Sequence, residues 1–385
     1  MKTIVNGIVL KGVNLEPSKE NLLIDDGKII EIAKDIKEGE IIDADGCIVC
    51  PSFLNAHTHI GDSIIKDETY GLSIEDMVKP PNGVKHVALS NASDEEIIKS
   101  MKIAMWEMLD SGTTHFIDYR EGGIKGIKLL KEASKDIPIN PTILGRDDSF
   151  YEESPDLHKV KIAIRKILKE ADGIAPSGFG EINKEVADLI TEKCADKGKI
   201  SSIHVAETQK SQYDAIDNFN KTEVKMALES KFNQLVHCTN PVGKDINWIA
   251  NSNSNLVLCP RANASLGVGI APLYKFLNMK IKPLIGTDNL MINSPNIIRE
   301  LEFSMKISSV YYNKYIDPKE VLKLATSNIC YSSINRNINK SIIEKDNFAN
   351  LLIIKQISKN PYLSIINRCE TKNIIYTMTK STNNN

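Results

Sequence analysis

Four of the seven histidines in this 385-residue chain, and one aspartate, stand at the ends of short apolar runs. Alternate side chains of an extended strand point to the same side, so His57 and His59 would face together. These two could be ordinary strand histidines, but His204, His237 and Asp288 follow apolar runs further along the chain. Imidazole and carboxylate groups are typical ligands of divalent metals. The pattern therefore predicts a metal centre.

This set of residues resembles the metal-dependent amidohydrolase superfamily, with a His pair after the first barrel strand, single His residues after the fifth and sixth, and Asp after the eighth. Glu207, three residues after His204, gives the His-x-x-Glu pattern of the aminohydrolase branch, which includes cytosine deaminase and the triazine chlorohydrolases. The stretch Cys259 to Asn263 is similar to the Cys-Pro-Arg-Ser-Asn of archaeal predicted chlorohydrolases. The resemblance covers nearly the whole chain.

The resemblance implies one divalent ion, zinc or iron, held by a set of four ligands: His57, His59, His204 and Asp288. Such an ion lowers the pKa of a coordinated water from 15.7 to about 7, which makes hydroxide available at neutral pH. By the same resemblance Asp288 takes up the proton of that water. Two-metal members usually carry a modified lysine at the fourth strand, and the range 173–180 contains no lysine. A mononuclear centre is therefore expected.

Two further residues are catalytic candidates. The resemblance implies that Glu207 carries a proton to a ring nitrogen and then to the departing amine. The alternative is a surface glutamate near the positive end of a helix, where a carboxylate is stabilising. His237 would polarise water and substrate from the outer shell of the metal, and the alternatives are a second-metal ligand or a buried histidine bonded to a carbonyl.

Candidate substrate contacts lie in loops after barrel strands. Arg261 and Asn263 follow the seventh strand, in a connection that Pro260 and Gly267 also make an ordinary turn-rich loop. Arg120 and Arg146 follow the second and third strands. With Glu121 and Asp147 they could instead form a ring of ion pairs that stabilises these loops. His86 lies in the long first loop, 62–91, which is long enough to be a lid.

Composition bounds the function. A formal net charge of -2 gives no electrostatic footprint for nucleic acid, and no apolar stretch approaches the roughly 20 residues of a membrane helix. We therefore expect a cytoplasmic protein that acts on a small molecule. Pairing of two copies through barrel helices is common in families of this kind. Cys47 and Cys50 form a C-x-x-C without a second pair, which favours buried strand cysteines over a zinc site.

The elements that must position these residues follow an alternation of strand-like and helix-like runs, typical of a parallel sheet wrapped by helices. The range 51–340 is predicted to be a TIM-type (β/α)8 barrel of the α/β class, with its chemistry at the C-terminal ends of the strands. The ranges 1–50 and 341–385 are predicted to form a small β-sandwich from both chain ends. Helices are expected over 94–109, 124–133, 159–169, 185–195, 215–228, 297–310 and 318–334.

The predicted function is hydrolytic deamination of a nitrogen heterocycle, a purine, a pyrimidine or a related base, with release of ammonia. Dechlorination or hydrolysis of a cyclic amide at the same site is the first alternative. A catalytically inactive barrel used for binding or assembly is the second, although every ligand position is kept. The stretch after His59 lacks the Arg-Gly common in nucleoside deaminases, so an adenosine-type substrate cannot be carried over.

Overall fold

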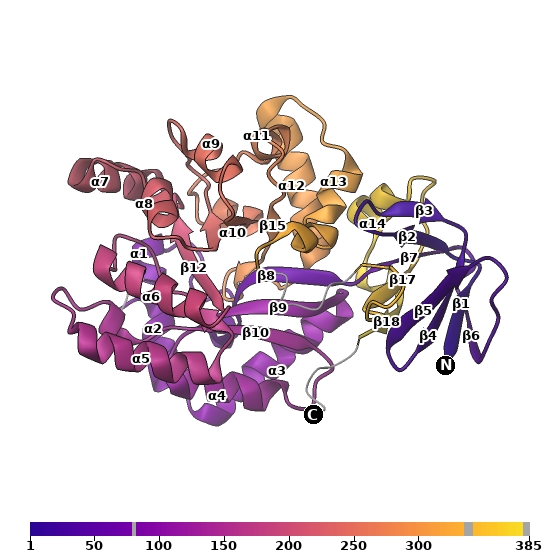
Figure 1. The fold of residues 1–385 in the computed structure, drawn as a ribbon, viewed down its shortest axis with the longest axis horizontal. Coiled ribbons are helices and arrows are strands. Elements are labelled where there is room, and N and C mark those ends of the chain that lie inside the picture. The colour runs from indigo at the N-terminus through magenta and orange to yellow at the C-terminus, as the bar shows by residue number, and fades with distance from the viewer. Residues whose placement is uncertain (79–81, 335–341, 380–385) are drawn as a thin grey trace.

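A parallel barrel forms the larger part of the molecule. The structure is a computed structural model that describes residues 1–78, 82–334 and 342–379, and none of the helices in these ranges is long and apolar enough to cross a membrane. The barrel strands, in sheet order from β15 through β14 down to β8 and β16, pair in parallel, as the predicted TIM-type barrel requires (Figure 1). Their bounds are β8 Phe53–His59, β9 Thr113–Arg120, β10 Asn140–Gly145, β11 Gly173–Ile174, β12 Ile200–Val205, β13 Gln234–His237, β14 Asn255–Leu258, β15 Leu284–Ile285 and β16 Asp288–Asn289.

The eighth barrel strand is interrupted, and its two halves close the barrel. β15 pairs with β14, and β16 pairs with β8. Between the halves, Asn55 of β8 accepts a hydrogen bond from the Thr287 amide at 3.0 Å and donates one to the Thr287 hydroxyl at 2.7 Å. Gly286 lies so close to β8 that a Cβ there would fall 2.6 Å from the His57 amide nitrogen. Closure of the barrel therefore also fixes the backbone of His57.

Replacing Gly286 with alanine is expected to destabilise the protein by about 3 kcal/mol, because backbone cannot move away from an added methyl group as a flexible side chain can. Urea denaturation measures this loss, and metal content should fall with it because His57 is displaced. Gly180→Ala is the matched control, since a Cβ at Gly180 would meet no atom within 4 Å. Equal stability of the two variants would contradict the close approach.

Helices surround the barrel (Figure 1). Along β9 and β13, Ile117 and Val236 point into the barrel interior, whereas their neighbours Phe116 and Leu235 join the core beneath the helices. The helices are α3 Asp94–Asp110, α4 Gly123–Ser134, α5 Leu157–Glu170, α6 Lys184–Asp196, α7 Gln209–Phe219, α8 Glu223–Glu229, α9 Asp245–Ala250, α10 Pro260–Ser265, α11 Leu273–Asn278, α12 Ile297–Tyr312 and α13 Pro318–Lys323.

The helix predicted over 215–228 is wrong, because the structure has two helices there. α7 ends at Asn220, whose φ of 52° is left-handed and ends the helical hydrogen bonding. Thr222 then caps α8 by accepting a hydrogen bond from the Lys225 amide. A helical pattern of apolar residues continues across the break, which explains the single predicted helix.

Two other predicted elements are shorter than expected. The helix predicted over 318–334 ends in α13 at Lys323, because Thr326 leaves helical dihedral angles (φ −131°, ψ −99°), and the 3-10 helix η3 Ser327–Tyr331 follows. The strand predicted over 173–178 is reduced to the two residues of β11.

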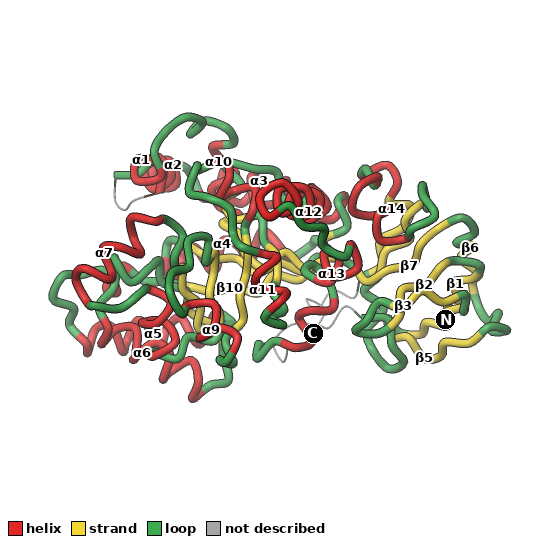
Figure 2. Tube along the Cα trace, turned by 90° about the horizontal axis from the view of Figure 1, so that it is seen from above, coloured by secondary structure: helices red, strands yellow, loops and turns green. Residues whose placement is uncertain are grey.

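The first long loop is partly helical rather than irregular. It contains the 3-10 helix η1 Ile60–Ile65 and the helices α1 Ile74–Val78 and α2 Val84–Asn91. Figure 2 shows α1 and α2 together at one edge of the barrel. Met77 of α1 and Met291, after β16, belong to one small apolar cluster with Ile65, so this segment packs on the C-terminal end of the barrel.

Both chain ends build the small β-sandwich, as predicted. One sheet has the order β5-β4-β1-β6 and the other the order β18-β17-β7-β2-β3, and Ile24 and Ile353 from the two sheets share one apolar core. The strands are β1 Lys2–Val5, β2 Ile8–Lys11, β3 Glu16–Ser18, β4 Asn21–Asp25, β5 Lys28–Ala33, β6 Glu40–Asp43, β7 Cys47–Pro51, β17 Leu351–Lys355 and β18 Ile374–Met378, with helix α14 Pro361–Arg368 beside them.

The apolar run from Cys47 to Leu54 crosses from the sandwich into the barrel. β7 ends at Pro51 and pairs with β17 and β2, whereas β8 begins at Phe53 and pairs with β9. Cys47 packs in the sandwich core and Cys50 in the core beneath the barrel helices, so the two thiols face different cores. The predicted domain limit at 340/341 and the tail 381–385 lie outside the described residues, and the domain limits stay a prediction.

Candidate metal centre

The four predicted ligands converge at the C-terminal end of the barrel. His57 Nε2 lies 3.1 Å from Asp288 Oδ1, and His59 Nε2 lies 3.6 Å from the same oxygen. His204 Nε2 lies 3.3 Å from His57 Nε2. Side chains separated by more than two hundred positions of sequence therefore lie within 3.6 Å of one another in these pairs, with His57 common to the two groups that could hold a metal ion.

Hydrogen bonds at the far ring nitrogens orient two of these imidazoles. His59 Nδ1 donates to Glu121 Oε1 at 2.9 Å, with the Tyr119 carbonyl 3.2 Å away, and His204 Nδ1 donates to the Ser177 carbonyl at 3.2 Å. A neutral imidazole that donates through Nδ1 presents a lone pair at Nε2. Both Nε2 atoms face the common point, which is the orientation that a metal ligand requires.

The chemistry of the donor set fits a divalent cation. Burial lowers the pKa of His57 and of His204, and it lowers the pKa of His59 to about 3, so all three are neutral near pH 7. Asp288 Oδ2 is buried and has no hydrogen-bond partner in the part of the chain that the structure describes. One proton can form a hydrogen bond in only one of the close contacts between His57, His59, His204 and Asp288, whereas a cation among these atoms would interact with every one of them. Three imidazoles with one carboxylate suit zinc or iron.

His237 and Glu207 face each other beside this centre. His237 Nε2 lies 3.7 Å from Glu207 Oε2. His237 Nδ1 donates to Asn263 Oδ1 at 3.0 Å, and Asn263 in turn donates to the Thr239 hydroxyl at 2.7 Å. His237 also lies within reach of the metal point with His57 and Asp288. Asn263 therefore positions His237, and both the outer role and a ligand role remain open to His237.

Strained backbone marks the strand ends that carry the site. Ala206, immediately before Glu207, has φ 50°, His237 has φ 73° and Asp288 has φ 61°. The left-handed region is uncommon for residues other than glycine and persists only where surrounding contacts impose it. The barrel thus holds three parts of the candidate site, at the ends of the fifth, sixth and eighth strands, in conformations that a free chain would avoid.

Glu121 is the centre of a buried ion network behind His59. Its carboxylate contacts Lys85 Nζ at 2.6 Å, the Arg120 guanidinium at 2.6 Å and the Arg146 guanidinium at 2.8 Å. Burial opposes ionisation, but these three cations hold the pKa of Glu121 well below its ordinary range. The network matches the ion-pair alternative for Arg120 and Arg146, and it gives His59 a charged hydrogen-bond acceptor.

A cavity of about 190 Å³ opens over the centre. Of the five predicted substrate contacts, two line this cavity and three do not. Arg146 and His86 line it, and His86 Nε2 lies 3.0 Å from the Val78 carbonyl. Arg120, Arg261 and Asn263 do not line it. The Arg261 side chain pairs instead with the buried Glu300, at 3.4 Å.

Sequence reasoning missed two residues that line this cavity. Lys85 of α2 is 2% exposed and reaches Glu121 and Asn289 from the long first loop. Glu223, the first residue of α8, accepts hydrogen bonds from the Ala206 amide at 2.7 Å and the Ser211 hydroxyl at 2.9 Å. In the sequence Lys85 falls in the long first loop and Glu223 in a predicted helix, and neither residue belongs to a motif that would have identified it.

Glu223 holds the strained backbone that precedes Glu207, so we expect it to act as a positioning residue. Glu223→Ala should lower kcat on the order of 10²-fold with metal content unchanged, because small displacements of a catalytic group have effects of this size. Glu223→Gln keeps an oxygen for the Ala206 amide and should stay within about threefold of wild type. Steady-state kinetics with metal analysis tests both variants, and a glutamine variant as inactive as the alanine variant would show that charge matters rather than position.

Comparison with known proteins extends these findings. Residues 48–383 match the sequence model of the amidohydrolase family. A provisionally assigned aminohydrolase of Methanothermobacter thermautotrophicus is 42% identical over 381 residues, which cover 99% of this chain and 98% of that protein. A 5-methylthioadenosine/S-adenosylhomocysteine deaminase of Clostridium tetani is 29% identical over 332 residues, 82% of this chain and 74% of that protein.

The fold is also found among solved structures. A zinc-bound adenosine deaminase from Xanthomonas campestris superposes with a TM-score of 0.85 at 15% identity, over 99% of this chain and 92% of that chain. At this identity the likeness concerns the fold, and it agrees with the barrel and sandwich described above.

Proposed function

The chain belongs to the amidohydrolase family, and on that premise we propose that it is a metal-dependent deaminase that replaces an amino group on a nitrogen heterocycle with hydroxyl and releases ammonia. One observation carries the proposal: the carboxylate of Glu207 lies beside His237 at the edge of a four-ligand centre. Metal-assisted hydrolysis needs the centre, and loss of an amine also needs a proton donor. Residues suited to both roles, His59, His204, Asp288 and Glu207, line one cavity, which supports the proposal.

We assign one divalent ion, zinc or iron, to His57, His59, His204 and Asp288. When bound, the ion supplies an activated water at neutral pH by lowering the pKa of that water to about 7. The carboxylate of Asp288 has one oxygen toward His57 and His59 and a second oxygen without a protein partner. That second oxygen is the atom to which we assign the proton released by water.

Glu207 is the residue that we assign to proton transfer on the substrate side. Burial raises the pKa of its carboxyl group, which favours a form able to donate a proton. An amine departs as ammonia only after protonation, so this donor is a requirement of deamination. His237, held by Asn263, lies opposite Glu207 and would orient the substrate group that is attacked.

The substrate that this cavity suits is a small, flat heterocycle. Arg146 and His86 line the cavity and are the two predicted substrate contacts that we retain. The relative from Clostridium tetani acts, by its name, on adenine-containing compounds, which supports an amino-substituted base as the reacting part. Purines, pyrimidines and related bases remain the proposed class.

Ammonia release is the direct test. Purified protein, loaded with one equivalent of zinc or iron, should release ammonia from at least one member of a library of aminopurines, aminopyrimidines and aminotriazines, and chelation should stop the release. Release of chloride or ring opening without ammonia would overturn deamination in favour of the alternative chemistry. Protein purified without chelators that holds less than about a tenth of an equivalent of metal would instead support an inactive barrel.

A further inference from the structure

A second cavity adjoins the reaction cavity. We call it the side compartment: it has a volume of about 600 Å³, and its walls come from Tyr151, the range 179–184, the end of α7 and the helix α8. Gly180 and Glu181 line both cavities. Ligand pockets usually measure about 300 to 1,000 Å³, so the reaction cavity of about 190 Å³ is small and the side compartment falls within this range.

Tyr151 stands between the two cavities. Its phenol oxygen accepts a hydrogen bond from the Ser177 amide at 3.3 Å, and Ser177 lines the reaction cavity whereas Tyr151 lines the side compartment. The two cavities therefore share a wall at Gly180 and Glu181, next to the hydrogen bond between Ser177 and Tyr151. Glu181 is exposed, and we take its side chain as the boundary that a ligand extending from one cavity to the other would pass.

Apolar side chains cover much of the side compartment. Phe179 is buried beneath it against Phe232, Met226 of α8 lines it, and Phe219 is 54% exposed at its mouth. A ligand that covers an exposed phenylalanine removes apolar surface from water, which stabilises the complex. The apolar part of a bound substituent would be recognised here.

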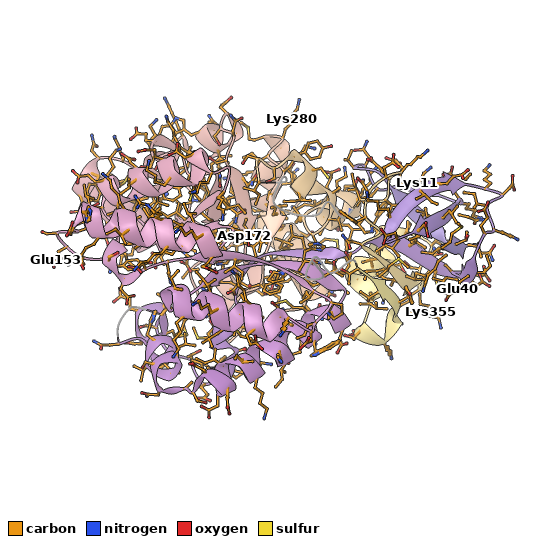
Figure 3. The ribbon with its side chains drawn as sticks, turned by 60° about the horizontal axis from the view of Figure 1, so that its bottom comes forward. Lys11, Glu40, Glu153, Asp172, Lys280 and Lys355 are labelled. Atoms are coloured by element: carbon orange, nitrogen blue, oxygen red, sulfur yellow. The ribbon has the colours of Figure 1, made fainter. Side chains whose placement is uncertain are left out.

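The charged side chains of the side compartment leave an excess of carboxylates. Lys221 pairs with Glu229 at 2.7 Å, and Lys184 pairs with Asp188. Glu152, Glu153 and Glu181 have no ion-pair partner within 4.0 Å among the described residues, and Arg146 of the reaction cavity, which interacts electrostatically with Glu181, already pairs with Glu121. Figure 3 shows Glu153 at one end of the molecule and the sandwich, with Lys11 and Lys355, at the other end. Because carboxylates outnumber ammonium groups in the lining of the side compartment, the local electrostatic potential favours a cation.

From this arrangement we propose that the substrate is a heterocycle with an arm, an apolar chain that ends in a protonated amine. The amino-bearing ring would lie in the reaction cavity and the arm in the side compartment, with its chain against Phe219 and Met226 and its ammonium group near Glu152, Glu153 and Glu181. This substrate class rests on the proposed deaminase function for the ring but on the side compartment alone for the arm.

Binding of matched ligands tests the arm separately from turnover. Isothermal titration calorimetry of the zinc-loaded full chain compares 6-aminopurine with its 9-butyl and 9-(4-aminobutyl) derivatives. We expect the aminobutyl compound to bind at least tenfold more tightly than the butyl compound, and the butyl compound more tightly than the bare ring. Weaker or equal binding of the aminobutyl compound would overturn the proposal, whether or not ammonia is released.

Variants locate the effect. The combined variant Glu152→Gln, Glu153→Gln and Glu181→Gln should bring the affinity for the aminobutyl compound to that for the butyl compound, and Phe219→Ala should weaken both armed compounds about threefold. Glu185→Gln, an exposed residue of α6 that does not line the side compartment, is the matched control and should change nothing. An unchanged preference in the combined variant would place the arm elsewhere.

Discussion

Replacing Glu207 with glutamine is expected to lower ammonia release about 10³-fold while metal content and thermal stability stay at wild-type values. Glutamine has the shape of glutamate but cannot donate and recover a proton at neutral pH. Glu207 is about three-quarters buried, lies 3.7 Å from His237 and belongs to neither group of candidate metal ligands among the described residues, so the substitution is expected to remove the proton and to leave the ligands in place. Steady-state ammonia assays with elemental analysis of the same preparation measure both quantities.

Glu185→Gln is the control that the fold provides for this experiment. Glu185 lies in the first turn of α6, at the same end of the barrel as Glu207, but does not line the reaction cavity. It represents the alternative view of Glu207 as a surface carboxylate near a helix start. If Glu207→Gln loses no more activity than Glu185→Gln, the proton shuttle is excluded.

The candidate metal ligands could be grouped from the sequence because barrel geometry relates sequence order to position. Each candidate ended an apolar run, and in a parallel barrel all such ends lie on one face. His57, His59, His204, His237 and Asp288 could therefore be grouped without knowledge of any contact, and the resemblance to the amidohydrolase superfamily selected four of them as ligands. The structure brings these four within 3.1 to 3.6 Å in the measured pairs. Helical and strand periodicity likewise predicted most of the barrel elements.

Residues whose role depends on the tertiary contacts of a long side chain were not predictable in this way. Lys85 and Arg261 both fall in segments that the sequence presents as loops after barrel strands, and nothing in the sequence distinguishes the two cations. Lys85 enters the site because Glu121 and Asn289 offer it buried acceptors, whereas Arg261 is held by Glu300 outside the cavity. The position of each side chain depends on the ion-pair or hydrogen-bond partner that it contacts, and that partner is set by tertiary packing.

Caps decide where helices end, and they explain the main error in the predicted elements. The apolar periodicity of 215–228 continues through Asn220 and Thr222, but these two residues end one helix and begin the next. The break places Glu223 at the start of α8, where its carboxylate can reach the Ala206 amide. A single straight helix would have carried this carboxylate elsewhere, so the unpredicted break has a consequence for the candidate site.

Asp288→Asn should separate the two roles assigned to Asp288. An amide oxygen can still contact a metal ion but is neutral and cannot take up a proton, so metal affinity should fall and turnover should fall further. We expect at least a 10³-fold loss of kcat that persists when excess zinc restores one equivalent of bound metal. Titration with zinc while metal content and ammonia release are both measured gives the result.

The matched control is Asp172→Asn, because Asp172 also accepts a hydrogen bond in the barrel, from the Ile143 amide at 2.8 Å, yet lies before β11 at the opposite end from the site. Asp172→Asn should keep full metal content and activity. Recovery of wild-type turnover by zinc-saturated Asp288→Asn would mean that Asp288 is a ligand only, and the proton of the attacking water would then have to go to His237, whose Nε2 faces the same cavity. We expect the loss of kcat to persist, because Asp288 Oδ2 is buried without a hydrogen-bond partner among the described residues. If Asp288 served only as a ligand through Oδ1, its Oδ2 would be free to accept a hydrogen bond from the barrel.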